Sequence, residues 1–502
     1  MAKNNGNPII AAVDLGSNSF HLTLAQLQHN NLQIIGRLKE KVRLAAGLDK
    51  NNILTEESQQ RAFNCLEQFK QRLGDSDTAY VRAVGTYALR KAKNTPEFLL
   101  KAEAILGYPI EVISGREEAR LIFEGVAHFQ LTNRKQMVVD IGGGSTEFAI
   151  GEAFEPVLLD SLQMGCVSYS QKFFNDGLVS KSNFKRAITA ARLELLSIQD
   201  LYLREGWEIT VGTSGTIESI LDIYQATNSE KSDITLNDLL TLKRRLIDTK
   251  NIADINLEGL SETRREILPA GLAILIAIFK TLKIESMSTS PAALREGLLY
   301  ELVGQEKTAD IKERAVRGLL ARYHIDMDQA RRVNTIALLL WNKVAKPWDL
   351  DNDYFKYMLS WAARCHEIGL SINFSKQQKH GEYIIKNSDL SGFSIMQQRL
   401  LALLVRSFRR KFPLHRFEVI SDDKFRTQLI RLGRILRLAV LFNHRRRDVA
   451  WPEIEVAVDN EEMTLVFPAQ YLSEHSLLAA DLEQEQAYLS QVNLPLLFLE
   501  HQ

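Results

Sequence analysis

The stretch AAVDLGSNSF, residues 11–20, and the stretch MVVDIGGGSTEF, residues 137–148, share one short pattern. In each, an apolar strand ends near an Asp and runs into a turn rich in Gly and Ser. Such a turn can present backbone N–H groups to phosphate oxygens, and the Asp can hold a divalent metal or its water. One such turn is also ordinary turn chemistry. Two at matching places predict two phosphate-binding walls of one cleft.

The order of elements around these turns repeats along the chain. Three β-rich runs followed by alternating helices and strands fill residues 1–125, and residues 126–305 begin the same order again. Two βββαβα units in tandem predict two similar α/β domains that face each other. The second unit also contains VGTSGT, residues 211–216, at a strand end. This third turn predicts a further phosphate or nucleotide contact, although a plain loop fits it about equally well.

Strand patterns nearly vanish after residue 305. Residues 306–450 predict an all-α domain, and residues 451–502 return to strands and predict a small α+β piece. RCHEIGL, residues 364–370, resembles the metal-dependent His-Asp (HD) phosphohydrolase helix, with Glu367 where Asp is expected. His366 and His380 are present, but the sequence offers no full set of ligands. We therefore expect an HD-like fold without its metal chemistry.

Composition narrows the class of protein. The 502 residues are 45% hydrophobic and 25% charged with zero net charge, which fits a soluble protein of several domains and selects no nucleic-acid or membrane partner. The three cysteines are far apart in sequence and lack CxxC spacing, which fits a reducing compartment. The longest apolar run, residues 268–279, is too short to span a bilayer, and the N-terminus lacks a signal-peptide pattern. We expect a cytoplasmic protein, with peripheral attachment to the inner face of the membrane left open.

Six motifs together resemble a known family. They are DLGSNSFH, VISGREEARLIF, DIGGGSTE, MGCVS, GTSGT and ALREGLLYE. In this order they resemble the exopolyphosphatase / guanosine pentaphosphate phosphohydrolase (Ppx/GppA) family of the actin–sugar kinase–Hsp70 superfamily. The resemblance runs through almost the whole chain. It implies two actin-like (ribonuclease H-like) α/β lobes followed by the helical HD-like domain and the C-terminal α+β piece, Mg²⁺-dependent hydrolysis of a terminal phosphoanhydride, and a homodimer.

The resemblance also implies roles for single residues. Glu118 matches the family's catalytic position and would activate water. Its neighbour Glu117 has capping-box spacing from Ser114, which gives Glu117 a structural role. Asp140 and Glu147 flank the turn IGGGST and can converge on one Mg²⁺, and Asp14 would do related work from the first lobe. The other phosphate-binding candidates are Gly16, Ser17, Asn18, Ser19, Arg90, Gly142, Gly143, Gly144, Ser145, Gly212, Ser214 and Gly215.

Charge is unevenly distributed in the back half. Residues 401–450 hold 13 Lys or Arg against four acids, whereas residues 451–502 hold ten acids and no Lys or Arg. A solvated helix face is the usual meaning of such a run. A basic stripe can instead track a long polyanion by releasing its counterions, or pair with the acidic tail of the same chain. The polyanion-track candidates are Arg406, Arg409, Arg410, Arg431, Arg434 and Arg437.

The sequence favours an exopolyphosphatase that releases orthophosphate processively from inorganic polyphosphate. This preference rests on the motifs around GGGSTE and on residues 151–168. KVRLAAGL and GLAILIAIF look closer to the branch that hydrolyses guanosine 5′-triphosphate 3′-diphosphate (pppGpp) to ppGpp. A kinase would need a nucleoside site and an acceptor pocket that the sequence does not show. A non-catalytic (p)ppGpp-binding regulator would tolerate the loss of Glu118, which this chain retains.

Overall fold

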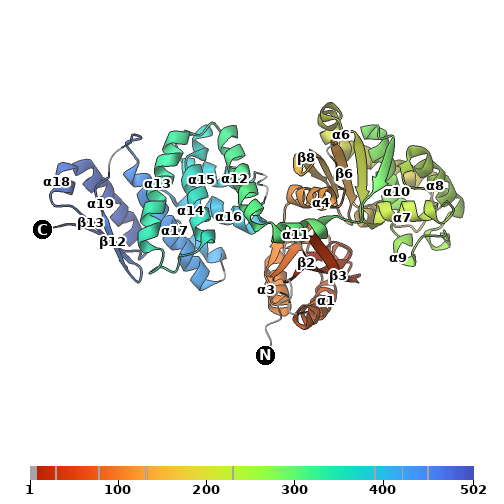
Figure 1. The fold of residues 1–502 in the computed structure, drawn as a ribbon, viewed down its shortest axis with the longest axis horizontal. Coiled ribbons are helices and arrows are strands. Elements are labelled where there is room, and N and C mark those ends of the chain that lie inside the picture. Colours follow the sequence, from red (N-terminus) through yellow and green to blue (C-terminus); the bar gives the residue numbers. More distant parts are fainter. Residues whose placement is uncertain are drawn as a thin grey trace. The chain divides into compact units, whose positions relative to one another are not determined.

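The computed structural model divides into two compact units, residues 1–309 and residues 310–502. It describes residues 8–501 except for residues 29–30, 77, 79, 131, 133, 229–230, 389, 391, 421 and 449–450. The first unit contains both predicted lobes, and the second contains the helical region together with the C-terminal α+β piece (Figure 1). Within the described residues, no helix combines the length and apolarity needed to cross a membrane.

The first lobe is a five-stranded sheet in the order β3-β2-β1-β4-β5. Its first three strands are antiparallel, and β4 and β5 continue parallel to β1. The strands are β1 (Ile9–Leu15), β2 (Phe20–Gln28), β3 (Asn31–Glu40), β4 (Tyr80–Gly85) and β5 (Ile110–Val112). The helices α1 (Glu56–Asp75), α2 (Tyr87–Lys91) and α3 (Thr95–Leu106) follow the chain between them. A buried apolar cluster that includes Phe69 and Phe98 joins α1 and α3 to the sheet.

The second lobe repeats this topology in the order β10-β11-β9-β6-β7-β8. Again three antiparallel strands lead, and β9 pairs parallel to β6 as β4 does to β1. The strands are β6 (Gln136–Ile141), β7 (Thr146–Glu152), β8 (Glu155–Leu162), β9 (Ile209–Thr213), β10 (Ile234–Thr235) and β11 (Ser286–Thr289). The helices are α5 (Cys166–Phe173), α6 (Lys181–Glu205), α7 (Ser214–Gln225), α8 (Leu236–Thr249), α9 (Glu262–Arg265) and α10 (Leu268–Leu282). The repeat inferred from the order of elements is therefore present in three dimensions.

Two helices join the lobes. They are α4 (Gly115–Phe129) and α11 (Leu294–Val303), and their apolar side chains form one buried cluster with residues of both sheets. They can approach closely because glycines stand at the contact. A Cβ at Gly297 would overlap the carbonyl of Leu121, and a Cβ at Gly125 would overlap the carbonyl of Ala293. The sequence division at residue 125 falls inside α4. The helix α11, at the end of the second predicted lobe, packs on β1, β2 and β4 of the first.

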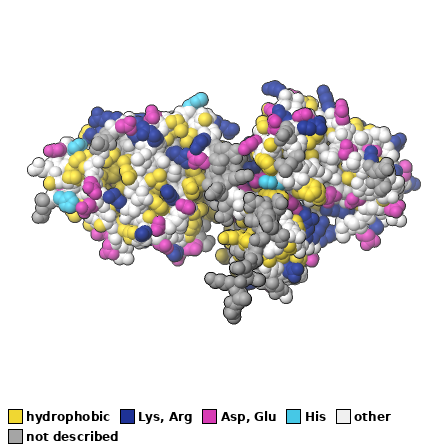
Figure 2. Space-filling model, viewed as in Figure 1, with side chains coloured by type: hydrophobic (Ala, Val, Ile, Leu, Met, Phe, Trp, Pro, Cys, Tyr) yellow, Lys and Arg dark blue, Asp and Glu magenta, His cyan; other side chains and the backbone are white. Residues whose placement is uncertain are grey.

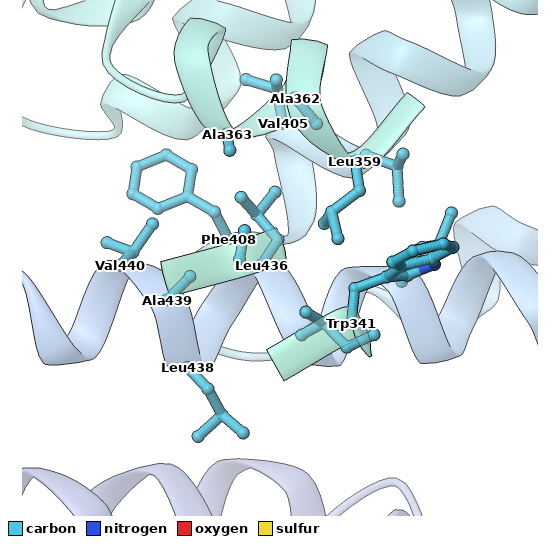
Figure 3. Close-up of a cluster of buried hydrophobic side chains, with 14 of the residues drawn as sticks. Trp341, Leu359, Ala362, Ala363, Val405, Phe408, Leu436, Leu438, Ala439 and Val440 are labelled. Carbon is cyan, nitrogen blue, oxygen red and sulfur yellow. The ribbon is translucent and has the colours of Figure 1, made fainter. Parts of the chain in front are cut away.

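The second unit is built around a bundle of helices. These are α12 (Gln305–Arg322), α13 (Met327–Val344), α14 (Asp353–Cys365), α15 (Gln377–Lys386), α16 (Ile395–Ser407) and α17 (Asp423–Phe442). Figure 3 shows the heart of this bundle, where Leu436 and Val440 of α17 lie among side chains that include Trp341, Ala363 and Phe408. The amphipathic helices of residues 306–450 predicted this packing, since each must bury one apolar stripe.

The C-terminal piece is a three-stranded sheet in the order β12-β13-β14 with two helices. Its elements are β12 (Glu455–Asp459), β13 (Glu462–Phe467), α18 (Tyr471–Glu474), α19 (Ser476–Ser490) and β14 (Leu496–Glu500). Met463, Leu465 and Leu482 belong to the same buried cluster as the helical bundle. The two regions distinguished by sequence texture thus share a single core.

Candidate functional site

A cleft of about 340 Å³ lies in the first unit and brings the three predicted turns together. Residues 16–19 line it from the first lobe, and residues 142–145 and 214–215 line it from the second. The two leading turns nearly touch, since a Cβ at Gly143 would lie 3.2 Å from Cβ of Ser17 and 3.5 Å from Cβ of Asn18. The pattern repeated in the sequence therefore forms two walls of one cleft.

The first wall starts at Asp14, near the end of β1. Its Oδ1 atom is buried and has no hydrogen-bond partner among the described residues. Position 16 requires a glycine, because a Cβ there would lie only 2.7 Å from the carbonyl oxygen of Ser19. The turn is held from behind by backbone bonds from Arg43 and Ala45 to the carbonyls of Asn18 and Ser17. The turn thus places an unpartnered carboxylate oxygen beside the backbone of residues 16–19 at the cleft.

The second wall is the turn between β6 and β7. Asp140 and Glu147 are direct partners in this antiparallel ladder, so their side chains lie on the same face of the sheet. The backbone amide of Gly142 donates to the carbonyl of Ser145 and closes the turn. A Cβ at Gly144 would overlap the ring of Tyr87 from the first lobe. The two acids are therefore neighbours on the sheet as expected, although only Asp140 lines the cleft, and their joint binding of one Mg²⁺ stays a prediction.

The third turn lies beside the second and supports Asp140. The hydroxyls of Thr213 and Ser214 donate to Asp140 Oδ2 over 2.6 and 2.7 Å. Ser214 has a φ of 69°, a left-handed backbone that side chains rarely adopt. A Cβ at Gly215 would overlap the guanidinium of Arg264 in α9, so this glycine makes room for a cation at the cleft.

Gly212 departs from the sequence prediction. It lies inside β9, where a Cβ would press on Ile217 and on the sulfur of Met287, and it does not line the cleft. Strand–helix packing therefore accounts for this glycine. The other candidates in the three turns all line the cleft.

Glu118 enters the cleft from the first turns of α4. Ser114 caps this helix as predicted, since its hydroxyl accepts the amide N–H of Glu117 over 3.2 Å. Both carboxylate oxygens of Glu117 accept from the buried guanidinium of Arg120, which also binds Glu301 of α11. Neighbouring acids thus have separate roles, because Glu117 anchors α4 to α11 while Glu118 points into the cleft.

Arg90 acts on Glu118 rather than lining the cleft itself. Its Nη1 donates to Glu118 Oε2 over 2.7 Å and to the carbonyl of Ile113 over 3.1 Å. Its Nη2 lies 4.0 Å from Glu147 Oε1. The guanidinium therefore bridges a carboxylate from each lobe.

Burial and mutual repulsion raise the pKa values of the acids in this cleft. Burial raises the pKa of Asp14 to about 7, with added contributions from Glu118 and Asp140. Burial also raises the pKa of Glu118 and, well above its usual range, that of Glu147, whereas Arg90 lowers both. The pKa of Asp140 is raised by burial and lowered by the hydrogen bonds from Thr213 and Ser214. A concentration of acids with shifted pKa values is typical of a functional site.

These acids fit a divalent cation. A cation would relieve the repulsion among Asp14, Asp140 and Glu147 and would give the buried Asp14 Oδ1 a partner. Within the residues that the structure describes, no group of three or more His, Cys, Asp or Glu side chains is arranged to hold a metal. Mg²⁺ commonly binds through one or two carboxylates, with water and substrate phosphates completing its shell. The donor set therefore suits Mg²⁺ bound together with a phosphate.

Sequence reasoning missed the cations of the cleft. Arg37, Lys39, Arg264 and Arg295 all line it, and all are more exposed than Glu118 and Asp140. Lys and Arg side chains gather on the visible face between the first lobe and the part of the second that carries α9 (Figure 2). Arg295 stands in the motif ALREGLLYE, which was the one signal available in the sequence for this group.

His21 holds one of these cations. Its Nδ1 lies 2.8 Å from Nη1 of Arg295. Burial lowers the pKa of His21 to about 2, helped by the charges of Arg295 and Lys39. A neutral ring accepts the hydrogen bond and orients the guanidinium, so His21, which also lines the cleft, positions Arg295.

Comparison with known proteins fits this geometry. Residues 23–306 match the Ppx/GppA phosphatase family, and residues 311–486 match its domain III. The chain belongs to the Ppx/GppA phosphatase family. A guanosine-5′-triphosphate,3′-diphosphate pyrophosphatase from Pseudoalteromonas translucida is 40% identical over 477 residues, 95% of either chain. Membership in the Ppx/GppA family makes the chain a hydrolase of phosphoanhydride bonds.

Solved structures of Ppx/GppA proteins share the fold. A crystal structure of an exopolyphosphatase from Cytophaga hutchinsonii gives a TM-score of 0.53 at 24% identity, covering 59% of this chain and 97% of that one. A structure of the Aquifex aeolicus Ppx/GppA enzyme gives a TM-score of 0.50 at 24% identity, covering 59% and 99%. The actin-like α/β architecture expected from the sequence is confirmed.

The second unit of this Ppx/GppA phosphatase contradicts half of the predicted polyanion track. Arg434 and Arg437 are buried in α17, and Arg431 is mostly so. Arg437 binds both oxygens of Glu485, and Arg431 binds Glu461. The guanidinium of Arg434 donates to the carbonyls of Glu461 and Pro495. These arginines bind Glu461, Glu485 and backbone carbonyls inside the unit instead of facing a ligand.

The other three predicted track residues lie nearer the surface. Arg406 pairs with Glu382, Arg409 stacks over the ring of Phe374, and Arg410 is exposed. Figure 2 shows basic and acidic side chains interspersed over the visible face of this unit. The continuous basic stripe written in the sequence is therefore divided between core and surface.

The HD-like segment of this Ppx/GppA phosphatase is engaged in packing. His366 is buried, and its Nδ1 lies 2.7 Å from the carbonyl of Ala363. Glu367 binds Arg446, which also binds Asp326. These contacts give the residues of RCHEIGL structural roles.

Proposed function

We propose that this Ppx/GppA phosphatase hydrolyses the terminal 5′-phosphate of pppGpp, giving ppGpp and orthophosphate. One observation carries the proposal. A single cleft combines three Gly- and Ser-rich turns and a buried Glu118 bound by Arg90 with a more exposed group of cations. The buried part suits a terminal phosphate and its attacking water, and the cationic part suits the remaining phosphates of a highly charged substrate.

The residues divide the chemistry as follows. The backbone N–H groups of the turns at residues 16–19 and 143–145 bind the oxygens of the terminal phosphate. Glu118 positions the attacking water and accepts its proton, while Arg90 holds the Glu118 carboxylate in place. Water adds to the terminal phosphorus, the bond from that phosphorus to the bridging oxygen breaks, and ppGpp leaves with that oxygen.

We further propose that one or two of the carboxylates of Asp14, Asp140 and Glu147, together with water and the substrate phosphate, hold Mg²⁺. Bound there, the ion supplies positive charge that offsets the charge developing on the phosphate oxygens. Thr213 and Ser214 fix Asp140 by hydrogen bonds, which orients its free oxygen toward the cleft.

Two observations support pppGpp over inorganic polyphosphate as the substrate. The Pseudoalteromonas relative, 40% identical over 95% of the chain, bears the name of the pppGpp activity. In addition, three of the six arginines expected to track a long polyanion are occupied by internal acids and carbonyls. Inorganic polyphosphate remains the second candidate, because the exposed Arg37 and Lys39 at the cleft would attract any phosphate chain.

The proposal is tested by identifying products. Purified protein with Mg²⁺ is expected to convert pppGpp to ppGpp with one orthophosphate per molecule, resolved by ion-exchange chromatography. The Glu118→Gln protein, prepared in the same way, is the control for contaminating phosphatases. Appearance of pppGp or guanosine products in place of ppGpp would contradict the proposal, because it would place a different bond at Glu118.

A further inference from the structure

Glu218 is a carboxylate in the cleft that the chemistry above leaves without a role. It lies on α7 one helical turn after Ser214, so both side chains share the face of α7 that meets the cleft. Unlike Glu118 and Asp140, which are buried, Glu218 is partly exposed. It therefore belongs to the outer, cationic part of the cleft.

Cations surround Glu218 without engaging it. Its charge interacts with Arg264 of α9, with Arg295 of the joining helix α11, and with Lys39 on β3 of the first lobe. Within the described part of the chain, its carboxylate makes no hydrogen bond and no ion pair, so no Lys or Arg nitrogen there lies within 4.0 Å. Partial burial raises the pKa of Glu218, and the charges of Arg264 and Arg295 lower it.

Such a group is a disadvantage for a site that binds phosphate alone. A carboxylate repels every phosphate of an inorganic polyphosphate, and an ionised polyphosphate chain offers no N–H donor to compensate. A nucleotide does offer donors. The N1–H and N2–H₂ groups of guanine point the same way and match the two oxygens of one carboxylate, whereas adenine lacks an N–H at N1.

We propose that Glu218 accepts the N1–H and N2–H₂ groups of guanine and so selects the guanine nucleotide over inorganic polyphosphate. This inference rests on the proposed function. In this arrangement, the 3′-diphosphate and the remaining 5′-phosphates of pppGpp contact the cations of the cleft, which are Arg37, Lys39, Arg264 and Arg295. The guanine base contacts Glu218, which lies beside these cations. A site whose hydrogen-bonding group is placed to bind the ligand discriminates against a ligand that lacks the matching group.

The test compares kcat/KM for pppGpp, its adenine analogue pppApp and inorganic polyphosphate in wild-type, Glu218→Gln and Asp222→Asn proteins. Asp222 is the matched control, because it lies one turn further along α7 and does not line the cleft. In Glu218→Gln we expect kcat/KM for pppGpp to fall about 10- to 100-fold, mainly through KM, as for loss of hydrogen bonds to a charged group. Values for pppApp and polyphosphate are expected to stay level or rise, and Asp222→Asn is expected to change none of them.

A change by one common factor for all three substrates in Glu218→Gln would overturn the inference, since it would show a general electrostatic effect. An unchanged pppGpp value would overturn it too. The proposed function fails separately, if wild-type protein turns over polyphosphate better than pppGpp. The affinity for ppGpp, measured by calorimetry, keeps the inference testable in that case. The affinity for ppGpp is expected to drop about 10-fold or more in Glu218→Gln. An unchanged affinity would show that Glu218 does not bind the guanine base.

Discussion

The guanidinium of Arg90 and the carboxylate of Glu118 lie in direct contact, with Nη1 donating to Oε2 over 2.7 Å. The two residues come from different elements, α2 and α4, and meet at the edge of the cleft. Arg90 favours the ionised form of a carboxylate that burial would otherwise protonate. Glu118 can therefore be ionised and buried at the same time, as a proton acceptor must be.

Adjacent glutamates of α4 are expected to give opposite phenotypes. Glu118→Gln should lower kcat by about 10²–10⁴-fold, the range for loss of a general base, with little change in melting temperature. Glu117→Gln should lower the melting temperature, because it breaks the buried pair with Arg120. Steady-state phosphate release and thermal unfolding of both proteins check this. Equal loss of activity with preserved folding in both would contradict the assignment.

Removing Arg90 is expected to shift the pH dependence of kcat. Arg90 lowers the pKa of Glu118, so Arg90→Gln lets that pKa rise. A base with a higher pKa becomes active at higher pH, and the acid limb of the profile should move upward. Arg116→Gln serves as the control. Arg116 lies in the first turn of α4, the helix that carries Glu118, and it pairs with Asp160 instead of Glu118. An unmoved acid limb in Arg90→Gln would show that Glu118 does not set it.

Without metal, the folded protein should become less stable as pH rises from about 4 to about 7. Burial raises the pKa of Asp14 from 3.8 to about 7, so the folded state binds more protons than the unfolded state in this window. The free energy of unfolding then falls with rising pH. Melting curves in EDTA from pH 5 to pH 8 are expected to show this decline, and Asp14→Asn should reduce it.

Mg²⁺ is expected to restore stability most strongly at the alkaline end of the same series, because it binds the ionised carboxylates. Thr213→Val should raise the Mg²⁺ concentration needed for half-maximal activity about 10- to 100-fold, because Thr213 orients Asp140. Mg²⁺ titrations of phosphate release give this number. The same Mg²⁺ dependence in wild-type and Thr213→Val proteins would place the metal away from Asp140.

The arginines of α17 should matter for folding and not for substrate. Arg437→Gln leaves Glu485 buried without its partner and is expected to cost about 3–5 kcal/mol in the free energy of unfolding. Arg410→Gln, at an exposed position, should cost almost nothing. Urea unfolding measures both. If Arg437→Gln keeps the wild-type stability and its polyphosphate hydrolysis depends less on salt, Arg437 contacts the substrate and the predicted polyanion track is correct at this position.

The sequence predicted the parts of the site that are local in the chain. A strand, an Asp and a Gly-rich turn lie within ten residues, so Asp14 and Asp140 were found where the structure places them. The cap of α4 by Ser114 was equally local. Arg264 and Arg295 were missed because they reach the cleft from α9 and α11, which only the tertiary fold brings together.

The arginines of α17 show a second limit. Their spacing at positions 431, 434 and 437 marks one helix face, but charge alone does not say whether that face meets water or protein. The ten acids without a single Lys or Arg in residues 451–502 were the available signal for an internal partner. The prediction that Gly212 contacts phosphate was wrong for a related reason, because a glycine at a strand end can serve packing as readily as ligand binding.

Competition between the two candidate substrates distinguishes the two activities. Wild-type protein with Mg²⁺ is given pppGpp and long-chain polyphosphate together at equal concentrations of terminal phosphate, and the initial rates of loss of each are followed. We expect pppGpp to be consumed first, with ppGpp accumulating while polyphosphate persists, and Glu118→Gln to stop both reactions. Faster loss of polyphosphate, with pppGpp left intact, would contradict it and would make this chain an exopolyphosphatase.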